Sequence, residues 1–131
     1  MIHKVREWMS SPVIVIDKDS SVLYALKLMR KRNIHSLVIQ IDQFPNEYGI
    51  ITSTDIRDKI FATDKNPAET SVGEIMSQSI ITANPDWDLK ECSIEMQKYN
   101  IHHMPVVDSS NNLLGIISVT DLFIAAEEIG W

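Results

Sequence analysis

One internal repeat spans nearly the whole amino-acid sequence. The stretch that begins at Val5 aligns with the stretch that begins at Val72, and the string GIITSTDI at residues 49–56 returns as GIISVTDL at residues 115–122. Because ordered self-similarity defines an architecture before any local pattern does, the sequence predicts two equivalent units. Other identities include Glu7/Glu74, Met9/Met76, Ser10/Ser77, Asp19/Asp86, Met29/Met96, Lys31/Lys98, Asn33/Asn100, Ile34/Ile101 and His35/His102.

Each copy begins with the same pattern. An apolar run, at residues 13–16 or 80–82, precedes a polar turn. Apolar residues then recur at i, i+3, i+4 and i+7, which is typical of an amphipathic helix. The predicted buried faces are Val22, Ala25, Leu26 and Met29 in the first copy and Leu89, Cys92, Ser93 and Met96 in the second.

The second half of each copy predicts a hairpin and another helix. The helix is expected to start at Thr54-Asp55 or Thr120-Asp121, since hydroxyl and carboxylate groups suit the free amides of a first turn. The resulting order is β-α-β-β-α, given twice, which is an α+β fold built from α/β-type units. The β-type runs lie at residues 36–41 and 49–52 and at 104–107 and 114–118, with turns at 43–47 around Pro45 and at 108–112.

The repeat also predicts the domain organisation. The first domain covers residues 1–62, a polar linker covers 63–71 and the second domain covers 72–131. Each half is too small to bury its own apolar faces well, so the halves are expected to pack together. The segments near Trp8-Met9 and Ile75-Met76 are expected to brace the start of each unit.

Composition and charge narrow the classes of function. Apolar residues make up 44% and charged residues 23%, which is typical of globular proteins, and no apolar run approaches the roughly 18 to 20 residues of a membrane span. No signal-peptide core is seen at the N-terminus, so a cytoplasmic location is expected. The net charge of −6 comes from interspersed acids and bases, which disfavours nucleic acid as a partner.

Cysteine and histidine do not form a recognisable reactive or metal site. The single cysteine, Cys92, excludes an intramolecular disulfide and falls on a predicted helix face, so it is expected to be a packing residue. A closed zinc site usually needs four ligands, whereas His35, His102 and His103 lack a companion Cys pair. No metal site and no catalytic residue are therefore predicted.

The end of the third β-type run in each copy is the candidate binding site. Thr52 stands at the strand end and Asp55 follows three residues later, and Ser118 and Asp121 repeat this spacing. Such a spacing suits a hydroxyl and first-turn amides against a phosphate, with the carboxylate accepting hydrogen bonds from ribose hydroxyls. The alternative is that these residues are only helix caps, but their recurrence in both copies favours binding.

The repeat motifs resemble tandem cystathionine-β-synthase (CBS) domains, the pair called a Bateman module, over nearly the whole chain. The resemblance implies two CBS repeats packed through their sheets with pseudo-two-fold symmetry, and an adenine nucleotide (AMP, ADP, ATP or S-adenosylmethionine) in the cleft between them. It also implies ribose contact by Asp55 and Asp121. Phosphate contact is implied for Thr52, Ser118, Thr54 and Thr120, and contact with the base for Val13, Ile14, Leu37, Ile80, Thr82, Met104 and Pro105.

The two copies are not identical in these motifs. Residues 102–108 match the family's hydrophobic-Pro-Val-Val-Asp segment, whereas residues 35–39 lack the proline. Arg57 lies two residues after Asp55 and is expected to reach a phosphate, while its counterpart Phe123 is not. The two sites are therefore expected to differ in affinity or in ligand.

Three functions compete on the sequence. The first is a non-catalytic regulatory module that senses an adenine nucleotide for a client protein and forms a homodimer, as the family resemblance implies. The second is a small metal-dependent hydrolase that uses the histidines with Asp55 or Asp121. The sequence disfavours it, because no nucleophile–base pair, phosphate-binding glycine loop or metal motif is recognisable. The third is a purely structural dimerisation module.

Overall fold

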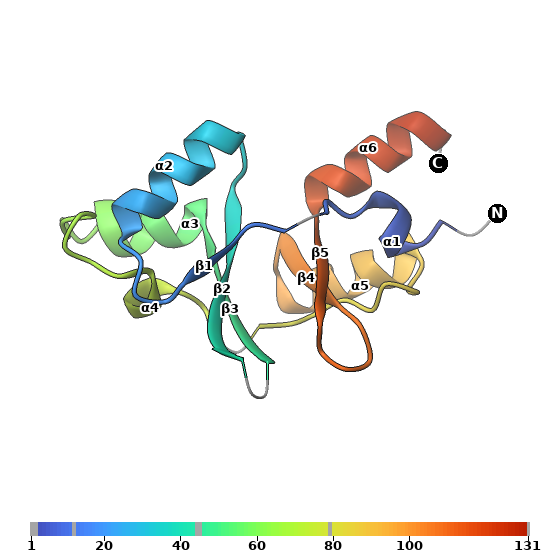
Figure 1. The fold of residues 1–131 in the computed structure, drawn as a ribbon. Helices are drawn as coiled ribbons and strands as arrows, with labels where there is room; N and C mark the ends of the chain where they lie inside the picture. The colour runs from blue at the N-terminus through green and yellow to red at the C-terminus, as the bar shows by residue number, and fades with distance from the viewer. Residues whose placement is uncertain (1–2, 12, 44–45, 79, 131) are drawn as a thin grey trace. The chain divides into compact units, whose positions relative to one another are not determined.

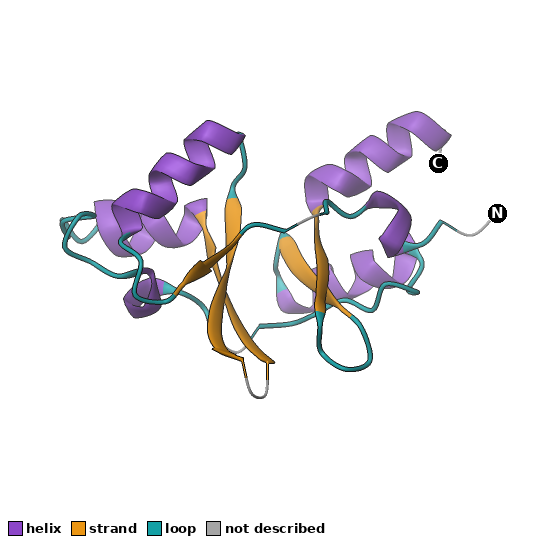
Figure 2. Ribbon diagram, viewed as in Figure 1, coloured by secondary structure: helices purple, strands orange, loops and turns teal. Residues whose placement is uncertain are grey.

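The computed structural model describes residues 3–11, 13–43, 46–78 and 80–130 of the 131-residue chain. The chain divides into two compact units, which we call the central unit (residues 14–80) and the terminal unit (residues 1–13 with 81–131). Both units combine helices with a small sheet (Figures 1 and 2), which confirms the predicted α+β class. The packing of the two repeats through their sheets stays a prediction.

The central unit follows the predicted β-α-β-β-α order. Its three-stranded sheet has the order β1-β2-β3, with β1 parallel to β2 and β2 antiparallel to β3. The helices α3 and η1 are continuous in the chain, and η1 is a single π turn. The elements are β1 (Val15–Asp17), α2 (Val22–Arg32), β2 (Ser36–Gln43), β3 (Asn46–Thr52), α3 (Ser53–Ile56), η1 (Arg57–Phe61) and α4 (Val72–Ile75).

The helix α2 shows why the local sequence folds this way. It begins where Ser21 Oγ accepts a hydrogen bond from the Tyr24 N–H, and it ends at Asn33, whose φ of 53° is the left-handed conformation of a C-cap. Of the predicted face, Val22, Ala25 and Met29 are buried and Leu26 packs against the same core. The helical period therefore confirms the predicted core face.

The terminal unit contains a two-stranded antiparallel sheet. The predicted face of its first long helix is confirmed, because Leu89, Cys92 and Met96 are buried. Ser93 is half-buried, and its hydroxyl donates a hydrogen bond to the Leu89 carbonyl. The elements are α1 (Val5–Trp8), α5 (Leu89–Tyr99), β4 (His103–Val107), β5 (Leu113–Ser118) and α6 (Val119–Ile129).

The strand predicted at residues 80–82 is wrong. Only one parallel bridge forms there, between Ala83 and Val106. The chain turns immediately afterwards, because the Asn84 side chain accepts a hydrogen bond from the Asp86 N–H and Pro85 has no N–H to donate to a ladder. The second copy thus lacks the longer first strand that β1 supplies in the first copy.

The start segment of each copy packs on the core of the other copy. Val5 is completely buried in the terminal unit, where its N–H donates to the Trp87 carbonyl, and Ser10 exchanges two backbone hydrogen bonds with Ile116. Val72 is completely buried in the central unit. Each start segment thus belongs to the compact unit that contains most of the other repeat, so the sequence repeats and the compact units are different sets of residues.

A glycine on each sheet permits this exchange. A Cβ atom on Gly115 would lie 2.8 Å from the Ser10 carbonyl oxygen, and one on Gly49 would lie 3.1 Å from the Ser77 carbonyl oxygen. The backbone of each start segment therefore approaches its sheet more closely than a side chain would allow. This close approach adds one bridged residue pair to β5 and another to β3.

The two predicted turns differ in what the structure describes. At residues 108–112 the Asp108 carboxylate accepts hydrogen bonds from the Ser110 and Asn112 N–H groups, so this hairpin connection is confirmed. The turn predicted at residues 43–47 includes 44–45, which lie outside the described residues.

Within the described part of the chain, no helix is both long enough and apolar enough to cross a membrane.

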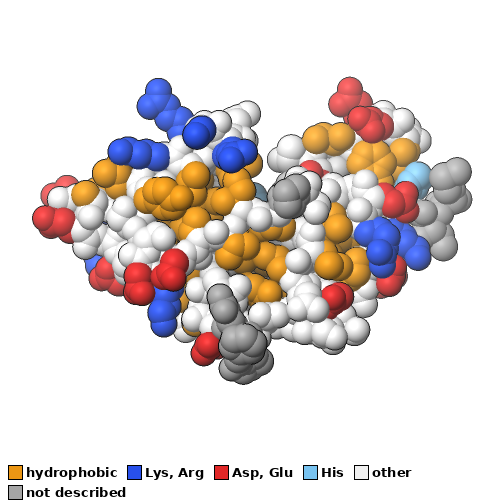
Figure 3. Space-filling model, in the orientation of Figure 1, with side chains coloured by type: hydrophobic (Ala, Val, Ile, Leu, Met, Phe, Trp, Pro, Cys, Tyr) orange, Lys and Arg blue, Asp and Glu red, His pale blue; other side chains and the backbone are white. Residues whose placement is uncertain are grey.

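The helical surfaces of the two units carry opposite charges. The helix α2 contains four bases and no acid, namely Lys27, Arg30, Lys31 and Arg32, whereas α6 contains three acids and no base, namely Asp121, Glu127 and Glu128. Figure 3 shows basic side chains gathered over α2 and acidic side chains at the end of α6. Each surface also exposes an aromatic side chain, Phe61 at 66% and Phe123 at 70%.

Candidate functional site

In the central unit, Thr52 and Asp55 form one hydrogen-bonded group at the junction of β3 and α3. The Asp55 Oδ2 atom accepts hydrogen bonds from the Thr52 N–H at 2.9 Å and the Thr52 hydroxyl at 3.1 Å, and Thr52 Oγ1 accepts one from the Asp55 N–H at 3.2 Å. This is a reciprocal capping box. It brings the two predicted site residues together and holds them in one orientation.

A third residue, Lys59, completes this group. Its Nζ atom lies 3.3 Å from Asp55 Oδ1 and donates a hydrogen bond of 2.8 Å to the Ile75 carbonyl. The Asp55 side chain is 15% exposed and the Lys59 side chain 44%. Lys59 was missed from the sequence, although the i,i+4 spacing from Asp55 is a signal for an ion pair on a helix.

In the terminal unit, Ser118 and Asp121 repeat the arrangement at the junction of β5 and α6. The Asp121 Oδ2 atom accepts hydrogen bonds from the Ser118 N–H at 2.8 Å and the Ser118 hydroxyl at 3.2 Å. Burial raises the pKa of the Asp121 carboxyl, and the bonds from Ser118 only partly oppose this. Among the residues that the structure describes, no base forms an ion pair with Asp121.

The remaining hydroxyl and cationic residues lie at the surface. Thr54 and Thr120 are exposed in the first turns of α3 and α6. Arg57 pairs with Asp58, with Nε 2.8 Å from Asp58 Oδ1, and its side chain is 70% exposed. The structure therefore places Arg57 in an ion pair of its own, not in the group formed by Asp55 and Lys59.

The residues predicted to contact the nucleobase fall into two classes according to their burial. Leu37 and Met104 are 1% and 0% exposed and belong to the cores, and Pro105 is also buried. The residues from the first apolar run of each copy are half-buried, and these are Val13, Ile14, Ile80 and Thr82. For Leu37 and Met104, the whole residue is therefore buried.

Cys92 and the histidines take structural positions. Burial, and then the charge of Asp121, raise the pKa of the Cys92 thiol to about 11, so the thiol stays protonated and the packing role is confirmed. The carbonyls of His35 and His102 accept hydrogen bonds from the Ser53 and Val119 N–H groups at 3.0 Å. Within the described ranges, no three His, Cys, Asp or Glu side chains are grouped to hold a metal.

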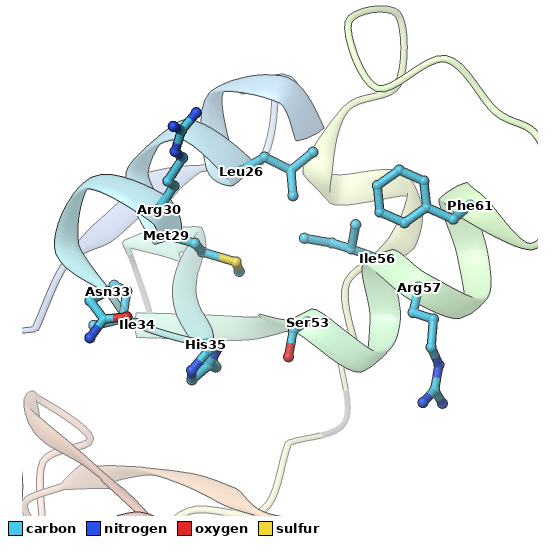
Figure 4. Close-up of a pocket in the computed structure, with 10 residues that line it drawn as sticks. All are labelled: Leu26, Met29, Arg30, Asn33, Ile34, His35, Ser53, Ile56, Arg57 and Phe61. Atoms are coloured by element: carbon cyan, nitrogen blue, oxygen red, sulfur yellow. The ribbon is translucent and has the colours of Figure 1, made fainter.

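The central unit also has a pocket of about 350 Å³ between α2 and the α3–η1 segment. Figure 4 shows Leu26, Met29, Ile56 and Phe61 around its apolar part, while the Arg57 side chain extends away from it. The pocket lies on the helical side of the unit and includes Ser53 at its edge. The sequence did not predict it.

Comparisons with known proteins identify the family. A family model described as the CBS domain matches residues 5–62 and 72–128. The chain is 37% identical over 121 residues to the L-aspartate semialdehyde sulfurtransferase of Methanocaldococcus jannaschii, covering 92% of this chain but only 23% of that protein. The chain therefore spans less than a quarter of that relative's length.

Two solved structures share the fold. The hexameric CBS-CP12 protein from bloom-forming cyanobacteria matches with a TM-score of 0.91 and 29% identity, over 98% of this chain and 71% of that chain. The CBS domain pair of protein MJ0100, solved with 5′-methylthioadenosine and S-adenosyl-L-methionine, matches with a TM-score of 0.86 and 33% identity, over 98% and 99%. The resemblance inferred from the repeat motifs is confirmed, and the chain belongs to the CBS domain family.

Proposed function

We propose that this chain is a non-catalytic regulatory module that binds an adenine nucleotide in the cleft between its two repeats. The ligand classes are AMP, ADP, ATP or S-adenosylmethionine. The observation that carries the proposal is that Thr52/Asp55 and Ser118/Asp121 adopt the same hydrogen-bonded geometry at equivalent strand ends. The MJ0100 domain pair, which covers this chain almost completely, was solved with two adenosine derivatives.

The proposed roles follow from the chemistry of each group. Asp55 and Asp121 each keep a second carboxylate oxygen outside the capping box, which suits hydrogen bonds from ribose hydroxyls. Leu37, Met104 and Pro105 are also assigned to the nucleobase but are buried, whereas the half-buried Val13, Ile14, Ile80 and Thr82 offer exposed surface to it. The residues assigned to phosphate are Thr52, Thr54, Arg57, Ser118 and Thr120.

Regulation requires a difference in affinity between two conformations. A nucleotide that binds one orientation of the repeats better than another shifts the equilibrium toward it, and a client protein reads that shift. The regulatory module is favoured over the hydrolase because both carboxylates are held in capping boxes, Asp55 with Thr52 and Asp121 with Ser118. The cytoplasmic location stays a prediction.

Separate substitutions of the two acids test the proposal. D55A and D121A should each weaken nucleotide binding about 10- to 100-fold at its own site, because a hydrogen bond to a charged group contributes about 1.5–3 kcal/mol. Isothermal titration with AMP, ATP and S-adenosylmethionine measures the affinities. The matched controls are D19A and E128A, which remove exposed acids from the central and terminal units and should leave the affinities unchanged.

Thermal unfolding of D55A and D121A serves as the check on folding, since loss of a helix cap costs about 1 kcal/mol. Unchanged affinity in both folded variants would remove the assigned ribose role. Failure of the unmodified chain to bind any of the three nucleotides at millimolar concentration would instead favour the purely structural module.

We also propose that the chain forms a homodimer in which the basic α2–η1 surface of one copy meets the acidic α6 surface of the other. The charges are complementary, and each surface exposes a large aromatic side chain. The apolar pocket beside Phe61 suits an inserted aromatic ring such as Phe123. A two-fold axis would form this contact twice and close the assembly.

A single substitution tests the dimer. The unmodified chain should elute at twice its 14.9 kDa mass in size-exclusion chromatography with light scattering. F123E should raise the dimer dissociation constant about 30-fold or more, since a buried interface aromatic contributes about 2 kcal/mol. I94E, which changes an exposed residue of α5, should leave the dimer intact. A monomeric unmodified chain, or an F123E dimer of normal affinity, would contradict this arrangement.

A further inference from the structure

The two candidate sites differ in charge more than the sequence alignment indicates. In the central unit, Lys59 Nζ lies 3.3 Å from Asp55 Oδ1, so the carboxylate has a cation directly beside it. The helix α6 of the terminal unit contains no lysine or arginine, and among the described residues no cationic side chain forms an ion pair with Asp121. One site thus pairs an acid with a base, whereas the other presents an acid alone.

The central unit has the π turn η1 where the terminal unit continues as the α-helix α6. After the first helical turn, the next buried residue follows Ile56 by four positions, at Ile60, but follows Leu122 by only three, at Ala125. A π turn adds one residue to a helical turn and is often found at functional sites. Lys59 therefore stays outward beside Asp55, while Ala125, its counterpart in the alignment, is completely buried.

The position of Lys59 is held from two sides. Its ammonium group donates a 2.8 Å hydrogen bond to the Ile75 carbonyl at the end of α4 and faces Asp55 Oδ1. Yet the side chain remains 44% exposed, so a ligand can reach it. An ammonium group has three donors, and these two contacts leave one for a further acceptor such as a phosphate oxygen.

We propose that Lys59 makes the Thr52/Asp55 site selective for an adenosine derivative with an anionic 5′ group, such as a phosphate. This inference rests on the proposed nucleotide function. The Ser118/Asp121 site takes a derivative whose 5′ group is uncharged or cationic, such as a thioether or a sulfonium, so that Ser118 and Thr120 contact this 5′ group in place of a phosphate. The physical reason is that a lysine attracts phosphate as a point charge, whereas an uncompensated carboxylate repels it.

Two probes that share one nucleoside isolate the charge. AMP and 5′-methylthioadenosine differ only in the 5′ group, one a phosphate and the other a methylthioether. The unmodified chain should bind both at once, so that saturation with one probe leaves the affinity for the other unchanged in isothermal titration. K59M should weaken AMP binding about 10-fold or more and leave 5′-methylthioadenosine binding unchanged, since the charge-assisted hydrogen bond from Lys59 to the ligand is made to the phosphate alone.

Three further variants control this experiment. K59R keeps the positive charge and should retain AMP binding, while K90M removes an exposed lysine of α5 and should change neither affinity. I124K introduces a lysine three residues after Asp121 and should create a second AMP site. Because I124K leaves Lys59 untouched, it keeps the inference testable even if K59M does not fold.

The outcomes separate this inference from the proposed function. Equal losses for both probes in K59M, or competition between AMP and 5′-methylthioadenosine for one site, would overturn the selectivity while nucleotide binding still stands. An I124K chain that gains no AMP site would also count against it. If neither probe binds the unmodified chain at millimolar concentration, the proposed function itself fails, and this inference with it.

Discussion

Replacing Val5 with Asp should unfold the terminal unit, although residues 81–131 are left untouched. Val5 is 0% exposed and belongs to the apolar core of that unit. A buried carboxylate without a partner costs several kcal/mol, so we expect a loss of about 4 kcal/mol, a large part of the stability of a small domain. Chemical denaturation followed by circular dichroism measures the loss.

Hydrogen exchange shows which unit is affected by V5D. The amides of β4 and β5 should lose protection, whereas those of β2 and β3 should keep it, since the described core of the central unit does not contain Val5. V15D introduces the same group at a valine that is 40% exposed and should cost much less. Protected β4 and β5 amides in V5D would contradict the exchange of start segments.

Local periodicity was sufficient to predict the helix cores. The faces that begin at Val22 and Leu89 follow from the 3.6-residue period, which depends only on neighbours within a helix. The site pairs Thr52/Asp55 and Ser118/Asp121 were also predictable, because a capping box is a contact over three residues. Features that depend on contacts between residues three or four positions apart can therefore be predicted from the sequence.

Longer-range features were not predictable in this way. The segment around Val5 has the same apolar pattern whichever core it joins, so only the fold shows that it packs against Trp87 and Ile116. The role of Lys59 depends on a π turn, which the alignment hides because it pairs Lys59 with the buried Ala125. Tertiary packing decides both cases.

The resemblance to the family predicts a set of positions near a ligand, but it does not say which of these residues are accessible. Leu37 and Met104 occupy equivalent sites at the start of β2 and β4, and both side chains point into a core. From the sequence alone, an apolar residue at the start of a strand fits the lining of a nucleobase pocket and a hydrophobic core equally well. Burial separates the two roles.

Met104 provides the sharpest test of that separation. M104A should destabilise the terminal unit by about 3 kcal/mol, because the side chain is 0% exposed and its removal leaves a cavity in the core. At temperatures where the variant is folded, nucleotide affinity should be unchanged, since the β4–β5 pairing of Met104 with Ile117 preserves the main chain. Thermal unfolding and isothermal titration measure the two effects on one sample.

The comparison variant for M104A is I14A in the central unit. Ile14 is half-buried and packs against the edge of its core, so its truncation should cost less stability but weaken nucleotide binding through lost contact with the base. The two variants should therefore show opposite patterns. Weakened binding in M104A with normal stability would mean that its side chain leaves the core to contact the base, which its complete burial argues against.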